Sequence, residues 1–296
     1  MIVMQNRISF SLAGHHLDVY GNMEPRLLHY GIPGFATFIT AGSDKEWSVV
    51  FGSSIEKPAQ WDVLYNFVFA ENDIDSVFAR SEGAYYFYME PRDKSIAPLL
   101  MRYAGGDVVE ATVGNDVTML RFAMWMAVNM LAAKSKLTLI HSSVLVHENK
   151  AVLCLGESGT GKSTHTRLWM EHIPNTHRLN DDSPFLAVED GKAYIYGSPW
   201  SGKSDYFIRE RYPLAAVLRL SQAPSNKVRR LGVLEAFSAL QPSCPPALAQ
   251  DEAFQDLIVD MLSDVVSCTP VFHLACLPDA AAAWTSHDAI FGSCKH

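Results

Sequence analysis

The chain has 296 residues, of which 48% are hydrophobic and 19% are charged, and its formal net charge is −8. This size accommodates one large domain or two modest ones with a substantial core. The acidic balance argues against a nucleic-acid-binding surface, because such surfaces are usually basic, and it is sufficient to keep a protein soluble.

Three further features bear on where the protein works. No N-terminal segment combines a basic start with an apolar run, so we expect no signal peptide. The uncharged stretch at residues 122–133 is shorter than the roughly 20 residues that a membrane-spanning helix needs, so we expect a buried helix and no membrane partner. There are five cysteines, an odd number, and no pair shows C-x-x-C spacing, so the sequence predicts neither a disulfide framework nor a zinc site. A reducing cytoplasm fits this cysteine pattern best.

Residues 1–115 are predicted to form a β-rich N-terminal domain, to which no catalytic motif can be assigned. Apolar and polar residues alternate at residues 8–12, and Pro- and Gly-containing turns separate the segments that follow. Short runs of β-branched or aromatic residues predict further strands at 35–40, 47–51, 85–89 and 99–103.

The pattern changes near residue 116, where a second, α/β domain is expected to begin and to continue to residue 296. Asn115 or Asp116 is suited to cap a helix that runs to about Lys134 and is apolar on nearly every face, as buried helices are. Periodicity predicts strands at 137–141, 142–146, 151–155, 185–188, 193–196, 215–220 and 270–277, and helices at 162–172, 233–240, 249–263 and 279–290.

Residues 156–163 match the phosphate-binding pattern G-x-x-x-x-G-K-[ST] at every fixed position, between a predicted strand and a predicted helix. Glycines let the backbone wrap closely around a phosphate, and amide N–H groups with the following helix form an anion cradle. Lys162 is expected to reach the β- and γ-phosphates, and Ser163 to ligate magnesium. The residues predicted to bind the nucleotide are Gly156, Glu157, Ser158, Gly159, Thr160, Gly161, Lys162, Ser163 and Thr164. The motif predicts ATP and Mg²⁺ as cofactors, although motor proteins, switches and inert binders share it.

Asp181 and Asp182 follow an extended stretch at residues 176–179. Phosphoryl transfer to a hydroxyl needs one carboxylate for magnesium and another that accepts the hydroxyl proton. Adjacent side chains on an extended backbone point in opposite directions, so both carboxylates reach one site if the chain bends there. The alternative is a solvated turn, since Asn, Asp, Ser and Pro favour turns.

Other candidates accompany this pair. His141, at the end of a predicted strand, is either structural or a contact to metal or phosphate. Residues 197–203 are either a second functional loop or a structural turn around a packed tryptophan. In the functional case Lys203 would neutralise charge on the γ-phosphoryl group, and Trp200 would stack on a base or substrate. Arg219 is a weaker candidate for a phosphate contact.

Taken together, these residues resemble a known catalytic core. His141 with the segment that follows it, the loop 156–163 and the Asp181–Asp182 pair resemble the catalytic core of the HPr serine kinase/phosphorylase family. They are also similar to the ATP-dependent phosphoenolpyruvate carboxykinases, which share that fold. The resemblance covers roughly residues 137–220 and implies an α/β P-loop core of this type behind a β-rich N-terminal domain. It implies that residues 116–296 form an HPr-kinase-like nucleotide-binding domain.

The resemblance also implies a role for each residue. Lys162 would contact the β- and γ-phosphates, and Ser163 would ligate magnesium. Asp181 would be the base toward the acceptor hydroxyl and Asp182 the metal-side carboxylate, a division that could be swapped. His141 would lie beside the metal or the transferring phosphate.

The sequence departs from both families, because residues 197–203 stand where HPr kinases have an arginine-glycine signature and the carboxykinase arginine pattern is absent. We therefore expect a cytoplasmic ATP-dependent kinase that acts on a hydroxyl of a protein, a peptide or a small molecule. The alternatives are a nucleotide-binding regulatory or scaffold protein with little turnover and a carboxykinase-like enzyme. Kinases of this resemblance often form rings, so a homo-oligomer is a further expectation.

Overall fold

The computed structural model describes residues 7–21, 32–42, 46–69, 72–113, 116–202 and 206–292. The protein is a mixed α/β chain that divides into two compact units. Unit 1 comprises Met1–Lys134 and Ala247–Gln255, and unit 2 comprises Ser135–Pro246 and Asp256–His296. Among the described residues, no helix has the length and apolar character that crossing a bilayer requires.

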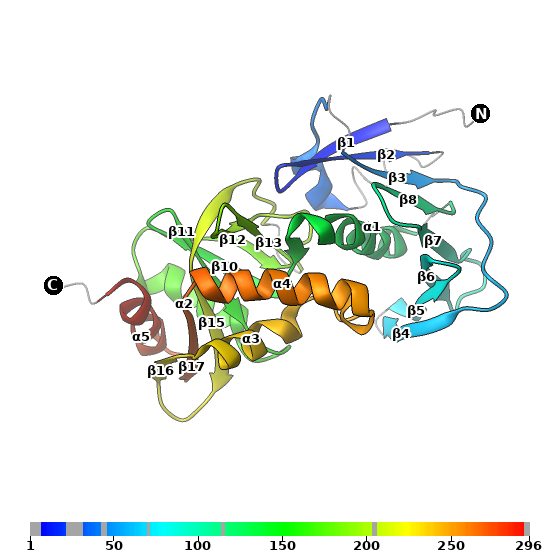
Figure 1. Cartoon of the computed structure of the whole chain (residues 1–296). Coiled ribbons are helices and arrows are strands. Elements are labelled where there is room, and N and C mark those ends of the chain that lie inside the picture. Colours follow the sequence, from blue (N-terminus) through cyan, green and yellow to red (C-terminus); the bar gives the residue numbers. More distant parts are fainter. Residues whose placement is uncertain are drawn as a thin grey trace. The chain divides into compact units, whose positions relative to one another are not determined.

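The described strands of unit 1 form a sheet in the order β1-β2-β3-β8-β7-β6-β5-β4 (Figure 1). They are β1 (Arg7–Leu12), β2 (His15–Tyr20), β3 (Trp47–Phe51), β4 (Asp62–Phe69), β5 (Ile74–Ser81), β6 (Ala84–Pro91), β7 (Leu99–Tyr103) and β8 (Val108–Ala111). The β-rich character of this region is thereby confirmed. The strand predicted at residues 35–40 is wrong, because Pro33–Phe38 forms the 3₁₀-helix η2. Pro33 presets a helical φ at its first position, and Phe35 and Phe38 are both buried.

Helix α1 (Val117–Ala132) follows this sheet in the chain. Asp116 caps it, since its carboxylate accepts a hydrogen bond of 2.8 Å from the Met119 amide. The helix is buried on nearly every face, as its sequence predicted, and it packs on β3, β6, β7 and β8. This packing explains why the residues up to Lys134 belong to unit 1, whereas the sequence placed the domain boundary between residues 115 and 116.

The described strands of unit 2 form a second sheet in the order β12-β10-β11-β15-β14-β13-β9, with β17 paired to both β15 and β16. They are β9 (Leu137–Leu139), β10 (Ser142–His147), β11 (Lys150–Leu155), β12 (Thr176–Asp182), β13 (Phe185–Glu189), β14 (Lys192–Tyr196), β15 (Arg211–Gln222), β16 (Lys227–Arg230) and β17 (Val271–Cys276). Strands β11, β15 and β17 run parallel to one another, and apolar residues fill their interiors, as in sheets buried on both faces.

Helices α2 (Lys162–His172) and α5 (Ala280–Phe291) pack on each other and on this sheet. Their shared core includes Val152, Trp169, Leu218 and Leu274, all buried. Helix α3 (Val233–Leu240) and the larger part of helix α4 (Glu252–Cys268) also belong to unit 2. Because only the loop at residues 156–161 separates β11 from α2, the core fixes the position of the helix N-terminus relative to the sheet.

A buried carboxylate at the start of α4 provides a stability test for unit 1. Asp251 accepts hydrogen bonds from the amides of Ala253 (3.1 Å) and Phe254 (3.2 Å) and from the Tyr85 hydroxyl (2.9 Å). Arg80 lies 3.3 Å from its other oxygen. Burial, and then Asp251 itself, raise the pKa of Tyr85 to about 12, so the hydroxyl stays a donor.

We predict that Asp251→Ala lowers the free energy of unfolding by about 2–3 kcal/mol, because buried donors lose a charged acceptor. Urea denaturation monitored by circular dichroism measures the change. The matched control is Asp256→Ala on the same helix, an exposed site where we expect a change within about 0.5 kcal/mol. Equal effects at the two positions would contradict a capping role for Asp251.

Candidate active site

The loop at residues 156–161 joins the end of β11 to the first turn of α2. Gly159 and Gly161 have φ values of 79° and 107°, a region that side chains other than glycine rarely adopt. The Thr160 amide and hydroxyl both donate to the Glu157 carbonyl, at 3.1 and 2.7 Å. The first helical bond runs from the His165 amide to the Gly161 carbonyl, so the amides of the first turn have no partner within the helix. The loop therefore ends on a set of N–H groups suited to an anion.

Lys162 is the first residue of α2, and its side chain turns back onto this loop. Its ammonium donates to the carbonyls of Gly156 (2.8 Å) and Glu157 (3.3 Å), which holds the side chain across the loop opening. Burial lowers the pKa of Lys162, and the nearby carboxylate of Asp182 acts in the opposite direction. A half-buried cation therefore lies between the loop and the acidic residues of β12.

Ser163 and Asp181 meet across α2 and β12. The Ser163 hydroxyl donates to Asp181 Oδ1 at 3.0 Å, and Arg178 Nη1 donates to Asp181 Oδ2 at 3.0 Å. The second guanidinium nitrogen of Arg178 donates to Thr166 Oγ1 (3.0 Å) and to the Ser163 carbonyl (3.4 Å). Arg178 and Asp181 are 9% and 13% exposed, so this is a nearly buried ion pair. It joins the last residues of β12 to the first turn of α2.

Asp182 has a different neighbour. Its Oδ1 lies 3.4 Å from Nδ1 of His141, whose side chain is half exposed. Both aspartates belong to β12 and pair in register with Ser142 and Ser143 of β10, so the alternative of a solvated turn is wrong. The pleat of the strand sends the two carboxylates to different sides, as extended geometry requires, and each finds its own partner.

A second loop, at residues 197–202, packs against the same end of β12. Buried Asn180 donates to the carbonyls of Ser198 (3.4 Å) and Trp200 (3.1 Å) and accepts from the Asp182 amide (3.1 Å). Gly202 has a φ of 49°, and a Cβ there would lie 2.9 Å from the Asp181 carbonyl oxygen. The loop thus lies closely against the aspartate pair.

Two expectations for this loop have different outcomes. Stacking of Trp200 on a base or substrate is wrong, because the side chain is 2% exposed and its ring meets Phe185 edge-on in the core. An indole buried in this way stabilises the loop and presents no face to a ligand. Lys203 lies outside the described residues.

Sequence reasoning missed Arg178. The available signal was a cation inside the predicted extended stretch, placed three residues before an aspartate. Arg219, expected to be a minor candidate, is partly buried in β15: its guanidinium donates to the Ala239 carbonyl at 3.4 Å and lies 3.8 Å from Glu157 of the loop. It is therefore a neighbour of the loop.

The oxygen donors at this site supply part of the coordination that a hard cation such as Mg²⁺ needs. Ser163 and Asp181 offer oxygens, and Mg²⁺ is usually held by one or two carboxylates together with water and substrate phosphates. Within the described segments, no group of three or more His, Cys, Asp and Glu side chains is arranged to hold a metal ion. A magnesium ion here would therefore need oxygens from a bound phosphate to complete its coordination.

An ion-pair test follows from this geometry. Arg178→Met should lower the free energy of unfolding by about 3 kcal/mol, because it leaves the nearly buried Asp181 carboxylate without its cation. Arg167→Met is the matched control: it removes an exposed pair with Glu171, worth about 0.5 kcal/mol or less. Denaturant titration of both variants decides the matter, and a loss for Arg178→Met as small as for the control would refute a structural role for the pair.

Comparison with known proteins gives a distant similarity. No protein-family model matches this chain, and no curated protein sequence matches it. Among solved structures, the chain is similar to the HPr(Ser) kinase/phosphatase from Coxiella burnetii, at 15% sequence identity and a TM-score of 0.24. The match covers 31% of this chain and 76% of that one. This similarity is too low to assign a family.

Proposed function

We propose that this protein is an ATP-dependent phosphotransferase, a kinase that moves the γ-phosphoryl group of ATP to a hydroxyl of a protein, a peptide or a small molecule. One observation carries the proposal: Lys162 and Ser163 open α2, Ser163 donates to Asp181, and the charges of Asp181 and of Asp182, which pairs with His141, both act on Lys162. Phosphoryl transfer requires a phosphate cradle, a cation and two acidic functions in one place. These residues supply each of them.

The loop and the first turn of α2 would hold the phosphates. Free amide N–H groups at a helix N-terminus bind anions, and the helix dipole favours negative charge there. The Lys162 ammonium now bonds to carbonyls of the loop and is within reach of a phosphate placed in it. It would lie at the β- and γ-phosphates, where charge shifts during transfer.

The metal-side carboxylate in this proposal is Asp181. Its Oδ1 accepts from Ser163, and its Oδ2 is paired with Arg178, so the carboxylate is oriented beside the hydroxyl expected to ligate magnesium. Bound there, Mg²⁺ would neutralise phosphate charge and align the γ-phosphoryl group. Ser163 and Asp181 would hold it. This division reverses the one implied by the family resemblance, in which Asp181 was the base.

Asp182 is then the base. Its carboxylate is more exposed than that of Asp181, and His141 orients it. Asp182 accepts the proton of the acceptor hydroxyl as the oxygen forms its bond to the γ-phosphorus. The bond between that phosphorus and the β–γ bridging oxygen breaks, and ADP leaves with the electron pair. A proton removed by a positioned carboxylate contributes about 10²–10⁴-fold to the rate.

Removal of the loop cation is the first test. Lys162→Ala should weaken binding of Mg·ATP by about 10–100-fold, as expected for losing a charged hydrogen bond to phosphate. Isothermal titration calorimetry measures the affinity, with Lys150→Ala, at an exposed lysine at the start of β11, as the control. Wild-type protein that binds no ATP, or equal affinities for the two variants, would remove the proposal's basis.

Turnover separates the kinase from its alternatives. The assay is ADP release from Mg·ATP with serine-containing peptides and small alcohols as acceptors. Phosphorylated acceptor supports the kinase. Tight ATP binding with no turnover on any acceptor would favour the regulatory or scaffold protein, and carbon dioxide release from oxaloacetate would favour the carboxykinase-like enzyme.

The two aspartates should give distinct defects. Asp182→Asn should lower kcat by about 10²-fold or more at saturating magnesium while retaining ATP affinity. Asp181→Asn should instead raise the magnesium concentration needed for half-maximal rate. Asp190→Asn is the control, at an exposed turn position with a φ of 48° that asparagine tolerates as well as aspartate. The opposite pattern would restore Asp181 as the base.

A further inference from the structure

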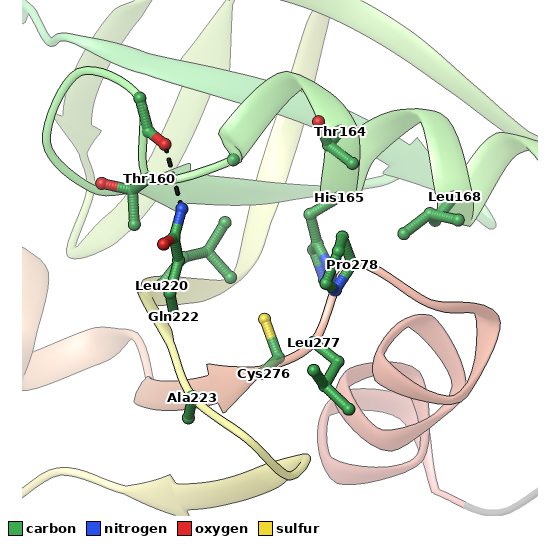
Figure 2. A pocket seen from close by; sticks show the side chains of 12 residues that line it. Thr160, Thr164, His165, Leu168, Leu220, Gln222, Ala223, Cys276, Leu277 and Pro278 are labelled. Carbon is green, nitrogen blue, oxygen red and sulfur yellow. Dashed lines mark hydrogen bonds between the residues drawn. The ribbon is translucent and has the colours of Figure 1, made fainter.

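A cavity of about 580 Å³ lies beside the loop and the first two turns of α2 (Figure 2). The loop contributes Gly159 to Gly161, the helix contributes Thr164, His165 and Leu168, and the ends of β15 and β17 close the other side. Its volume falls within the range of about 300–1,000 Å³ that is typical of small-molecule sites. The proposed phosphotransferase chemistry on the β12 side of the loop does not use it.

The topology of the sheet accounts for this position. Strands β11, β15 and β17 are parallel neighbours, so their carboxyl ends emerge at the same edge. The end of β11 continues into the loop, while the ends of β15 and β17 supply Gln222 and Cys276 to the cavity. In open α/β sheets, ligands bind outside the carboxyl ends of the strands. A ligand that begins in the loop would extend from there into the cavity.

Polar groups reach the cavity at few points. Figure 2 shows the Gln222 amide turned to the loop, where its Nε2 donates to the Gly159 carbonyl at 3.2 Å. That bond leaves the Gln222 carbonyl oxygen without a partner among the described residues. Leu168, Leu220 and Leu277 give much of the remaining lining its apolar character.

His165 is the second polar group, and it is 3% exposed with its ring directed at the cavity (Figure 2). Its Nε2 lies 3.1 Å from both Trp169 Nε1 and Ser286 Oγ, which fixes the ring plane. No described residue bonds its Nδ1. Burial lowers the pKa of His165 to about 4, so the ring is neutral near pH 7. None of the residues that line the cavity carries a charge at that pH.

We propose that this cavity binds the base and ribose of the nucleotide whose phosphates occupy the loop at residues 156–161. The inference rests on the proposed function and extends it to the other half of ATP. An uncharged, mainly apolar cavity with a free amide oxygen and an imidazole nitrogen suits a neutral heterocycle, which buries flat faces and needs few hydrogen bonds. The same lining would bind a free anion poorly, because it offers no cation.

A thiol in the cavity makes the proposal testable without a mutation. Cys276 lines the cavity, and its sulfur faces the open space in Figure 2. Cys268 is exposed on α4 and serves as the internal control. The full-length protein is treated with N-ethylmaleimide, and mass spectrometry follows each cysteine with Mg·ATP, with inorganic triphosphate, or with neither.

We expect Mg·ATP at about ten times its Kd to slow modification of Cys276 by about tenfold, because a tenth of the sites stay open. Inorganic triphosphate, which occupies the loop without a base, should leave the Cys276 rate unchanged. The Cys268 rate should be the same in all samples. ATP that binds without protecting Cys276 would overturn the subsite and leave the proposed function intact.

A filled cavity gives an independent readout. Ala223→Trp places an indole in the cavity, and we expect ATP affinity to fall by about tenfold or more while triphosphate affinity holds. Ala281→Trp, at an exposed site on α5, is the matched control. Cys154 and Cys244 are buried, with their pKa values raised to about 12, and their inertness in the variant verifies that it is folded. Unchanged ATP affinity refutes the subsite, whereas wild-type protein that binds neither ATP nor triphosphate refutes the proposed function as well.

Discussion

The pair of Arg178 and Asp181 is the interaction on which the candidate site depends. A nearly buried guanidinium is costly unless its charge is paired and its donors are used. Here it bonds Asp181, Thr166 and the Ser163 carbonyl, and the ring of Tyr206 lies 5.2 Å from its centre. Its Nε is buried and has no hydrogen-bond partner among the described residues. The pair fixes the end of β12 to the start of α2, and so it sets the distance between the carboxylates and the loop.

Strand geometry then assigns the two aspartates different surroundings. Adjacent residues of β12 face opposite sides, so Asp181 meets Ser163 and Arg178 while Asp182 meets His141. A bend is not needed to make both useful, because His141, just before β10, is the partner on one side and α2 supplies Ser163 on the other. The same constraint separates a nearly buried carboxylate, paired with a guanidinium, from a more exposed one beside an imidazole. This separation is what a division between metal-side acid and base requires.

Local signals explain which parts of this structure the sequence predicted. The loop and α2 follow from glycines, a lysine and helical periodicity within a short segment, and the structure has α2 at the predicted residues. The 3₁₀-helix at Pro33–Phe38 was missed because its aromatic residues also suit a strand. Burial of Trp200 and the role of Arg178 depend on contacts with residues that are distant in sequence or on another element. Propensity and motif spacing contain no information about such contacts.

The cavity beside α2 also depends on contacts that local sequence patterns do not predict. Its walls come from the loop after β11, from α2 and from the ends of β15 and β17. The parallel pairing of β11, β15 and β17, which no local pattern encodes, brings these parts to one edge. The result is a graded environment: amide donors and Lys162 at the loop, and an uncharged lining around Leu168 and Leu220 next to it. A nucleotide has the same gradation, from a charged polyphosphate to a neutral base. A free phosphate would find favourable contacts only in the loop, and a neutral heterocycle only in the cavity. A ligand that combines the two gains from both without paying a second time for the entropy of association, which is the physical argument for treating loop and cavity as one site.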